Sequence, residues 1–589
     1  MTHRAHLFSL RIAHALRESL RDPPYGLARL KGDLLAGITV GLVAIPLAMA
    51  LAIACGVPPQ YGLYAAIIAG FVTPLTGGSR YSISGPTAAF VVILYPIVQQ
   101  HGLAGLLIAS VLAGFILVLM ALLRLGRYIE YIPQPVTLGF TGGIAIVIAV
   151  LQIKDLLGLK LDALPVHFAA KVGVILQAVP HLHLPTVLVG LVTLLVLLKW
   201  HRLGTGLPPH LPALIVGAIM AWVLTLFGSE VATIGNSFHT VLGDGTQVNG
   251  IPSTLPEMRW PWSRTLPGET PLVISWHFAQ DMLTSAFAIA MLGAIESLLC
   301  AVVLDGMTGK KHSANSELLG QGLANIIAPF FGGITSTAAI ARSATNVKAG
   351  AQSPVAGAVH ALVVLLAILT LAPLLSYLPM ASMAALLIIV AWNMSEFHKA
   401  SHLVKTSPAS DIIVFATCLS LTVLFDMVIA ISVGIVLASL LFMKQMAEMT
   451  RLTDISANTK LLQEELPAGW KAFRIKGPLF FAAADRVFGD LTQQTPRQAG
   501  IILSMEGVSI LDAGGLAALQ KFISHCRRTN TLLCMTDFEF QPLKTLAKSG
   551  FKPDNITTFT APTLADAMTR ARAHSLSATP RPGKSSPAD

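Results

Sequence analysis

The sequence predicts an all-α polytopic membrane domain followed by a small cytoplasmic α/β domain, and three observations support this prediction. Hydrophobic residues make up 54% of the 589-residue chain and charged residues only 12%, whereas globular domains carry about 25% charged residues. Apolar runs long enough to cross, or nearly cross, a bilayer fill residues 34–447. After residue 447 charged residues return, and short apolar runs alternate with amphipathic ones, as in small α/β domains.

The domain organisation that follows has four parts. Residues 1–30 are basic and amphipathic and lack a small-residue cleavage site, so we expect a cytoplasmic segment along the membrane surface, not a cleaved signal peptide. Residues 31–447 form the transmembrane domain and residues 448–574 the cytoplasmic domain. Residues 575–589 are rich in Ser, Pro and Ala, which predicts a disordered tail.

The transmembrane domain is predicted to contain about fourteen segments. They are 34–54, 60–76, 86–99, 103–123, 135–152, 172–199, 211–228, 282–304, 316–331, 340–350, 354–375, 378–393, 411–426 and 429–447. Several are shorter than the about 20 residues that a full crossing requires. Most Lys and Arg residues fall in loops that are cytoplasmic when the N-terminus is inside, which the positive-inside rule explains better than a nucleic-acid patch. An even number of crossings then returns the C-terminus to the cytoplasm.

Two similar interruptions break the apolar sequence. Residues 74–90 read PLTGGSRYSISGPTAAF and residues 329–345 read PFFGGITSTAAIARSAT, both beginning Pro-x-x-Gly-Gly. In hydrocarbon, irregular backbone survives only where it is buried in protein or lines a cavity. Seven segments in each half would give the halves opposite orientations, that is, an inverted repeat whose two short helices face each other near the midplane. Helix N-termini aimed at a shared cavity favour an anion.

The first interruption supplies five candidate binding residues: Ser84, Gly85, Pro86, Thr87 and Ala88. Pro86 suits the first helical position, where its missing N–H would be unpaired in any case. Gly85 permits close approach to the backbone and Thr87 offers a hydroxyl. The alternative is a helix cap without a ligand.

The second interruption supplies five more candidates: Ala339, Ile340, Ala341, Arg342 and Ser343. Aligning the Gly-Gly pairs sets Pro86 against Ala341 and Thr87 against Arg342. Small side chains at 339 and 341 would leave the helix amides bare, and Leu47 would help to set the size of the pocket. Arg342 is the one cation of this stretch before Lys348, so it either attracts the anion or forms a structural ion pair, for which Glu296 is the candidate partner.

Glu296 lies within an apolar helix, where an ionisable side chain is by default a functional candidate. We expect it to couple transport to protons, with a purely structural pair as the alternative. Asp33 and Asp426 lie near helix ends and indicate capping or core pairing. Glu317 is predicted to cap the N-terminus of its own helix.

The five cysteines show no paired spacing, so we expect no disulfide, no metal and no cofactor. In the cytoplasmic domain, residues 473–484 are predicted to form two strands around a Gly-Pro turn, and residues 485–495 a helix. Residues 500–512 are predicted to form a buried strand with a following loop. An amphipathic helix at 513–528 and a strand at 531–537 complete the prediction.

Several motifs together resemble the SulP anion transporter family over residues 25–572. They are SGPTAAF (84–90), AIPLAMALA (44–52), GVPPQYGLYAA (56–66), AIESLL (294–299), NSELLGQGLANIIAPFFGG (315–333) and LDAGG (511–515), the last within a region that resembles the STAS domain. The runs CAVVLDGMTG (300–309) and VAWNMSE (390–396) are most similar to bacterial DauA-type members, which import C4-dicarboxylates.

The resemblance implies a homodimeric transporter of the bacterial inner membrane. It implies two inverted repeats of seven segments, a core domain moving against a gate domain in an elevator-like manner, and a site between the facing ends of segments three and ten. The expected activity is import of C4-dicarboxylates such as succinate and fumarate with protons. Sulfate or bicarbonate transport, or an anion channel, are the alternatives. An enzyme is not expected, because no nucleophile–base pair, metal cluster or phosphate loop is present.

Some STAS relatives that act in bacterial signalling carry a phosphorylated Ser after the Asp of the turn that corresponds to LDAGG. Here Ala513 follows Asp512, so the acceptor hydroxyl is absent. We therefore expect a structural role or a docking site for a cytoplasmic protein partner, and no phosphorylation at this turn.

Overall fold

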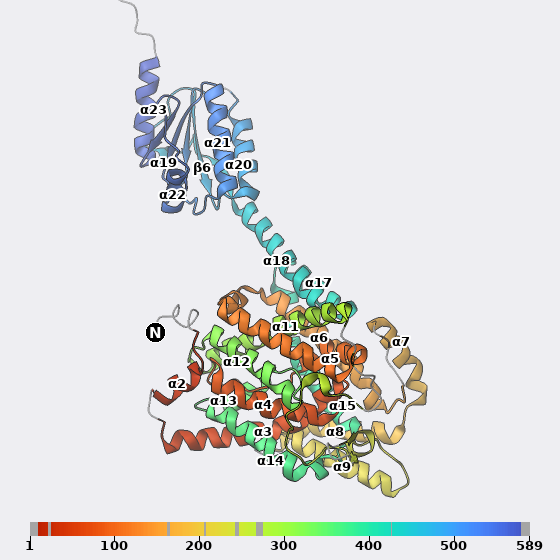
Figure 1. Ribbon diagram of the computed structural model, residues 1–589. Coiled ribbons are helices and arrows are strands. Elements are labelled where there is room, and N and C mark those ends of the chain that lie inside the picture. The colour runs from red at the N-terminus through yellow and green to blue at the C-terminus, as the bar shows by residue number, and fades with distance from the viewer. Residues whose placement is uncertain are drawn as a thin grey trace, which may run out of the picture. The chain divides into compact units, whose positions relative to one another are not determined.

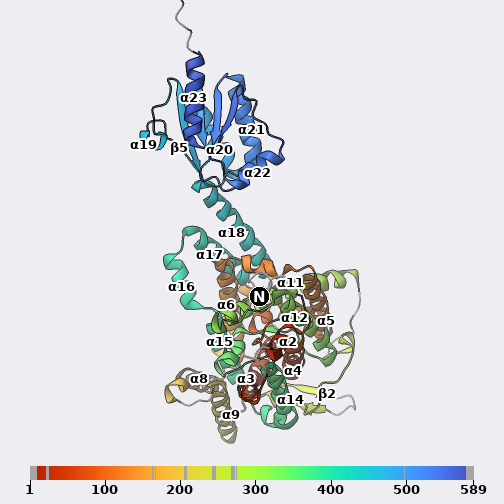
Figure 2. The ribbon, with the colours of Figure 1, turned by 90° about the vertical axis from the view of Figure 1, so that its left-hand side faces the viewer.

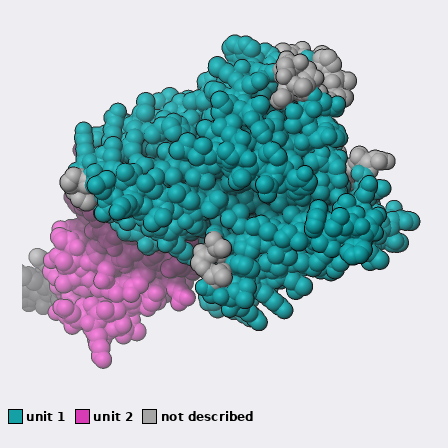
Figure 3. Space-filling view, turned by 90° about the horizontal axis from the view of Figure 1, so that it is seen from below, with its two compact units in different colours: residues 1–435 teal, residues 436–589 magenta. Residues whose placement is uncertain are grey.

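The structure is a computed structural model (Figures 1 and 2). It describes residues 10–21, 25–161, 165, 167–204, 208–241, 247–266, 272, 275–425, 427–496 and 498–578. The chain forms two compact units, residues 1–435 and 436–589, which Figure 3 colours separately. Asp426, residues 1–9 and most of the predicted tail lie outside the described residues.

The first unit, residues 1–435, is called the membrane unit below, and its first half is helical. Its helices are α2 (His14–Arg21), α3 (Leu27–Ala54), α4 (Pro59–Thr76), α5 (Ala88–Leu122), α6 (Gln134–Leu157), α7 (Phe168–Ala178), α8 (Leu184–Lys199) and α9 (His210–Leu226), with the 3-10 helix η1 (Leu125–Tyr131) between α5 and α6. Helix α5 contains two predicted segments, which meet at Gly102, where φ is +66°. That positive φ interrupts the helix and suits glycine.

A polar connection joins the two halves and contains α10 (Ile234–Ser237), β2 (His239–Val241), β3 (Gln247–Asn249) and η4 (Pro261–Ser263). The second half comprises α11 (Trp276–Thr308), α12 (Ala314–Ile327), η5 (Ala328–Phe331), α13 (Ile340–Lys348), α14 (Val355–Leu375), α15 (Met380–Met394), α16 (Phe397–Thr406), α17 (Ala409–Leu424) and the beginning of α18 (Met427–Met449), whose remainder belongs to the second unit. Within the described residues, seven helices are long and apolar enough to cross a membrane, and α9 and α17 are shorter apolar helices.

All fourteen predicted segments overlap helices, but the segment 172–199 is wrong as one straight span. The chain bends there by 111° between residues 168–181 and α8. Pro180 lies at this bend, within the 3-10 helix η2 (Val179–His181), and Pro185 lies in the first turn of α8. Proline disrupts a continuing helix but fits its first turn, so the two prolines end one helix and start the next. Helix α16, a short polar helix, lies outside the predicted segments.

Packing divides the helices of the membrane unit into two groups. In the first, α14 packs against α3 and α4, α5 against α11 and α12, and α13 against α3 and α11. In the second, α6 packs against α15 and α17, and α8 against α9 and α15. Figure 2 shows the second group on the left and most of the first group on the right. Each group combines helices from both halves of the chain.

The second unit contains a five-stranded sheet in the order β5-β6-β7-β8-β9. The strands are Arg451–Asp454, Trp470–Lys476, Gly500–Ser504, Leu532–Thr536 and Thr558–Ala561; the first pair is antiparallel and the others are parallel. Successive side chains of a strand point to opposite faces. Accordingly, Ile501 and Leu503 pack with α20 (Phe481–Gln494) and α21 (Ala513–Arg528), and Ile502 packs with α23 (Leu564–Ala578) on the other face.

Helix α21 and strands β7 and β8 confirm the elements predicted at 513–528, 500–512 and 531–537. The second strand predicted within 473–484 is wrong, because residues 481–484 open α20. The cause is a contact distant in sequence: the Asp512 carboxylate accepts a hydrogen bond from the Phe481 N–H at 3.2 Å. Residues 575–578 are helical in α23, so the predicted start of disorder at 575 is also wrong.

Candidate functional site

The two interruptions of the membrane unit lie side by side. Residues Ser84–Gly85 (β1) and Thr337–Ala338 (β4) form a short antiparallel ladder that pairs Ser84 with Ala338 and Gly85 with Thr337. Helix α5 starts after the first strand and α13 after the second. The ladder therefore satisfies backbone groups inside the membrane unit and holds two helix N-termini together.

The helix starts correct the predicted register. The N-cap residues are Thr87 for α5 and Ala339 for α13. Pro86 precedes the N-cap and is not the first helical residue, so the predicted equivalence of Pro86 with Ala341 is wrong. The reason is that the stretch from Gly78 to the N-cap residue Thr87 is longer than the stretch from Gly333 to the N-cap residue Ala339.

Helix α12 holds both interruptions in place through one polar face. The Glu317 carboxylate accepts hydrogen bonds from the backbone N–H groups of Gly78 (3.0 Å) and Ser79 (2.8 Å). Gln321 donates to the Ser84 hydroxyl at 2.8 Å. Asn325 accepts from the N–H of Ser336 and donates to its carbonyl, both at 2.8 Å. Residues spaced by four share a helix face, so this single stripe supplies partners for irregular backbone.

This arrangement corrects the prediction for Glu317. The N-cap of α12 is Ser313, and the Glu317 side chain binds the amides of a different segment instead of capping its own helix. Asp33 is a core partner, as predicted. Its buried carboxylate accepts hydrogen bonds from the Tyr25 hydroxyl (2.7 Å) and from the Gln352 (2.6 Å) and Ser353 (3.0 Å) amides.

A cavity of about 290 Å³ opens beside the two helix starts. It lies between the two helix groups. Of the predicted binding and coupling residues, those that line it are Leu47, Pro86, Thr87, Ala88, Glu296, Ala339, Ile340, Ala341 and Arg342. Ser84, Gly85 and Ser343 lie behind the wall. The Ser84 hydroxyl binds Gln321, and the Ser343 hydroxyl accepts from the Ile83 N–H at 2.9 Å.

Arg342 is buried at the start of α13, with only 1% of its surface exposed. Its Nη2 donates to the Pro86 carbonyl at 2.5 Å, whereas its Nε and Nη1 have no hydrogen-bond partner. No carboxylate of the described residues lies within 4.0 Å of the guanidinium, so the predicted ion pair with Glu296 does not form in this structure. A buried, incompletely bonded cation beside a cavity is costly unless an anion completes it.

Gly85 makes room for this guanidinium. A Cβ at position 85 would lie 2.8 Å from Nη1 and 3.4 Å from Nη2 of Arg342. Any larger residue would therefore push the guanidinium away from the Pro86 carbonyl. Gly85 acts on the cavity through Arg342 and not through a ligand contact of its own.

Glu296 lines the same cavity from α11. Its carboxylate accepts a hydrogen bond from the Thr87 hydroxyl at 2.8 Å. Neither N-cap side chain binds the amides of its own helix, and Ala339 has no polar side chain at all. The first amides of an α-helix have no partner within the helix. The starts of α5 and α13 thus lie beside a cavity that is also lined by two carboxylates, Glu296 and Glu396, and by the Arg342 guanidinium.

Sequence reasoning missed the remaining wall of the cavity, which the second helix group supplies. Phe140 and Thr141 come from α6, His210 from α9, and Val390 and Asn393 from α15. Nothing in the sequence links these positions to the interruptions. By contrast, Val43 and Leu51 could have been found, because they lie one helical turn on either side of Leu47.

The described residues contain no group of three or more His, Cys, Asp or Glu side chains placed to hold a metal ion. All five cysteines are free and buried. In the second unit, the Asp512 carboxylate accepts from the Gly515 N–H at 2.7 Å and caps α21. The first residue of that helix is Ala513, which has no hydroxyl to modify.

Two family models match the chain: the Sulfate permease family over residues 30–417 and the STAS domain over residues 464–567. YvdB of Bacillus subtilis (strain 168), whose name suggests sulfate transport, is 40% identical over 91% of this chain and 96% of its own length. The bicarbonate transporter BicA of Picosynechococcus sp. (strain ATCC 27264 / PCC 7002 / PR-6) is 29% identical over 78% of this chain and 80% of its own.

Solved structures agree on the fold. The murine Slc26a9 anion transporter in the inward-facing state is similar with a TM-score of 0.79 at 19% identity, over 97% of this chain and 95% of that one. The transmembrane domain of a cyanobacterial BicA gives 0.57 at 28% identity, over 70% of this chain and 98% of that one. The chain thus belongs to the sulfate permease (SulP) family: it is a multi-pass membrane anion transporter with a C-terminal STAS domain, not an enzyme.

Proposed function

We propose that this protein is a secondary active transporter that imports C4-dicarboxylates, such as succinate and fumarate, together with protons. The observation that supports this most directly is the half-bonded guanidinium of Arg342 beside a cavity onto which two helix N-termini open. An anion in that cavity would lie at the positive ends of both helix dipoles and beside the Arg342 guanidinium, and a small turn of that buried side chain toward the cavity would let the anion accept its free hydrogen bonds. The same dianion would be held from two opposite repeats.

The shape and lining of the cavity favour a dicarboxylate within the class of small anions. Leu47, Leu51, Phe140 and Val390 are apolar, and polar groups come from both helix groups: Arg342 from the first, Asn393 and His210 from the second. Apolar side chains in the lining suit the methylene carbons between two carboxylates. The cavity of about 290 Å³ is at the lower limit of the about 300 to 1,000 Å³ typical of ligand pockets.

Sulfate or bicarbonate is the second candidate substrate. It is favoured by the names of the relatives, above all BicA, which is similar along most of both chains. Either ion would bind Arg342 and the helix amides equally well, but would leave the apolar wall without a partner. The two candidates therefore differ in whether the apolar residues contribute to affinity.

Glu296 is the proposed coupling group. It lines the anion cavity and its one hydrogen bond comes from Thr87, the N-cap residue of α5. A carboxylate so close to an anion site repels the substrate when ionised and ceases to do so once protonated. Binding of a proton and binding of a dianion would thereby favour each other.

The cavity lies between two helix groups, which supports an elevator-like movement of the first group, with its bound anion, against the second. We further propose that the protein is a homodimer of the bacterial inner membrane with both termini in the cytoplasm, and that the STAS domain is structural or docks a protein partner. A channel would require no such movement, and uptake against a gradient separates the two modes.

Uptake into proteoliposomes under an imposed inward proton gradient tests the proposal. Labelled succinate, fumarate, sulfate and bicarbonate are compared side by side. We expect saturable, accumulating succinate and fumarate uptake that stops when the gradient is collapsed. Sulfate or bicarbonate uptake alone would replace the dicarboxylate proposal, and linear, non-accumulating flux would indicate a channel.

The variant Glu296→Gln isolates the coupling role. We expect it to abolish gradient-driven uptake while substrate binding is partly retained, because the amide keeps its size and its contact with Thr87 but takes up no proton. Leu299→Ala, on the same helix and in the same wall, is the matched control for altered packing. Gradient-driven uptake that survives in Glu296→Gln would remove the coupling role from this residue.

A further inference from the structure

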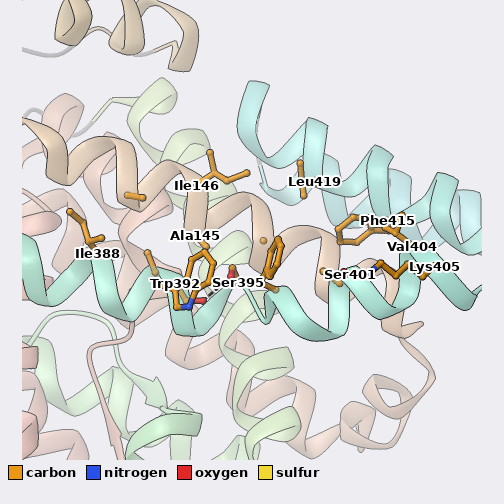
Figure 4. A pocket seen from close by; sticks show the side chains of 15 residues that line it. Ala145, Ile146, Ile388, Trp392, Ser395, Ser401, Val404, Lys405, Phe415 and Leu419 are labelled. Carbon is orange, nitrogen blue, oxygen red and sulfur yellow. Dashed lines mark hydrogen bonds between the residues drawn. The ribbon is translucent and has the colours of Figure 1, made fainter. Parts of the chain in front are cut away.

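A second, larger cavity lies on the outer surface of the second helix group. It has a volume of about 540 Å³ and is lined almost entirely by apolar side chains of α6, α15, α16 and α17 (Figure 4). Several of these side chains are exposed: 59% of Trp392, 41% of Ile146 and 48% of Val404. Because this unit spans a membrane, an exposed apolar groove of this kind faces lipid and not water.

One end of the groove is polar. Figure 4 shows Ile388 at one end of the set and Ser401 and Lys405 at the other. Lys399, on the same helix α16, is neutralised by Glu396 at 2.6 Å. Lys405, in contrast, has no ion pair with any described carboxylate. The groove thus combines an apolar trough with one unpaired ammonium and two serine hydroxyls, of which that of Ser395 donates a hydrogen bond to the Trp392 carbonyl at 2.7 Å.

We propose that this groove is a binding site for an anionic phospholipid. An acyl chain would lie along Ile388, Trp392 and Leu419, and the headgroup phosphate would accept hydrogen bonds from Lys405 and Ser401. The charge selects the occupant, since a neutral hydrocarbon fills the trough but leaves the ammonium unpaired. A cation near the membrane surface attracts anionic lipid by about 1 kcal/mol, which is about a fivefold preference.

The lipid groove and the anion cavity share their walls. On α15, Ile388, Ala391, Trp392 and Ser395 line the groove, whereas Val390, Asn393 and Met394 line the anion cavity. On α6, Ala145 and its neighbours line the groove and Phe140 and Thr141 the cavity. On α15 the two sets lie on opposite faces, so the thickness of this helix separates the two ligands, whereas on α6 the two sets are adjacent.

This geometry gives the lipid an influence on transport, a consequence that rests on the proposed function. An acyl chain packed against α15 restricts the side of the helix opposite to Asn393. Tightly packed cores pass such restrictions on, because they do not deform freely. We expect the rate of uptake of a given substrate to differ between vesicles with and without anionic lipid.

Fluorescence quenching of Trp392 tests the lipid site without any transport measurement. The full-length protein is reconstituted in vesicles in which either phosphatidylglycerol or phosphatidylcholine carries brominated chains, at equal mole fraction. The Trp392 contribution is the difference between wild type and Trp392→Phe. We expect about fivefold preferential quenching of this contribution by the brominated phosphatidylglycerol, and loss of the preference in Lys405→Gln.

Trp222 provides the matched control, since it is 62% exposed on α9 outside the groove. Its contribution, measured with Trp222→Phe, should show no preference between the two lipids. Equal quenching of Trp392 by both lipids, or a preference that persists in Lys405→Gln, would overturn the proposal. Ala400→Phe, which fills the groove near its polar end, should abolish the preference while leaving the fold intact by thermal denaturation.

Uptake is then measured in vesicles of each lipid. A preference in quenching without any lipid dependence of uptake would support the site and remove its influence on transport. An absence of uptake in every vesicle, with the quenching preference intact, would count against the proposed substrate and not against the lipid site.

Discussion

The two interruptions of the membrane unit can be compared residue by residue. Both begin with Gly-Gly, both pair through a two-residue strand, and both are bound by α12. They differ in what stands at the helix start. The first has Thr87 at the N-cap, bonded to Glu296; the second has Ala339 at the N-cap and Arg342 in the first turn.

The difference separates scaffold from chemistry. Repeated Gly-Gly sequences and the polar stripe of α12 generate the same unwound geometry twice. The dipole already makes a helix N-terminus positive, and Arg342 adds to this positive potential at the start of α13, which is the second half-helix. At the start of α5, which is the first half-helix, the Thr87 hydroxyl instead donates a hydrogen bond to the Glu296 carboxylate. In the proposed mechanism the second half-helix holds the anion and the first takes the proton.

The largest effect is expected from removing the scaffold. Glu317→Ala would leave the buried amides of Gly78 and Ser79 without their partner, at a cost of about 1–3 kcal/mol for each amide. The melting temperature of the detergent-solubilised protein measures this loss. Glu317→Gln keeps an acceptor oxygen and should lose less. A melting temperature of Glu317→Ala equal to that of the wild type would contradict the role given to α12.

Asn325→Ala tests the same scaffold at the second interruption. It removes the neutral side-chain oxygen that accepts from the Ser336 N–H and the neutral side-chain N–H that donates to the Ser336 carbonyl. Because hydrogen bonds to a charged group are the stronger ones, we expect a smaller fall in melting temperature than for Glu317→Ala. A larger fall would show that the second interruption is the more dependent of the two.

Arg342→Gln is expected to have the next largest effect, and on binding alone. Hydrogen bonds to charged groups contribute about 1.5–3 kcal/mol, so anion affinity should fall about 10- to 100-fold. Stability should not fall in parallel, because the variant also removes a buried guanidinium that lacks partners for Nε and Nη1. Isothermal titration gives the affinity and thermal denaturation the stability. Affinity within twofold of the wild type would exclude Arg342 from the anion site.

The chain itself indicates much of this arrangement. Hydropathy places the segments, and the repeated Pro-x-x-Gly-Gly places the interruptions, because backbone in a membrane tolerates such breaks only at a cavity. Arg342 and Glu296 stand out for the same reason: an ionisable residue in an apolar run requires a partner. Both line the cavity. Sequence patterns therefore predict those features that would cost free energy in a membrane if they had no partner or cavity.

The rest depends on contacts between residues distant in the sequence. The register of the helix starts follows from the ladder between Ser84 and Ala338, which alignment of glycines does not reveal. Glu317 has the pattern of a helix cap, yet its carboxylate is taken by amides from another segment. Asn393 and His210 belong to ordinary helix starts and ends, and only the packing of the second helix group brings them to the cavity.

Gly85→Ala should alter the second half-helix without touching its residues. The added methyl group would meet the Arg342 guanidinium at 2.8 Å and displace it from the Pro86 carbonyl. The loss of one hydrogen bond, about 0.5–1.5 kcal/mol, predicts a fall in anion affinity of about 2- to 10-fold by titration. In the Arg342→Gln background the same change should have little further effect, since both act through one group. Additive losses would mean that Gly85 contacts the ligand directly.

Thr87→Val completes the comparison at the first half-helix and should have the smallest effect. Valine keeps the shape of threonine but removes the 2.8 Å hydrogen bond to Glu296, worth about 1 kcal/mol. Proton-driven uptake should fall about fivefold, and Thr87→Ser should restore it. In the Glu296→Gln background, where coupling is already lost, titration should show that Thr87→Val leaves anion affinity unchanged. If affinity falls there as well, the hydroxyl of Thr87 binds the anion itself, and the two half-helices share the substrate instead of dividing anion and proton between them.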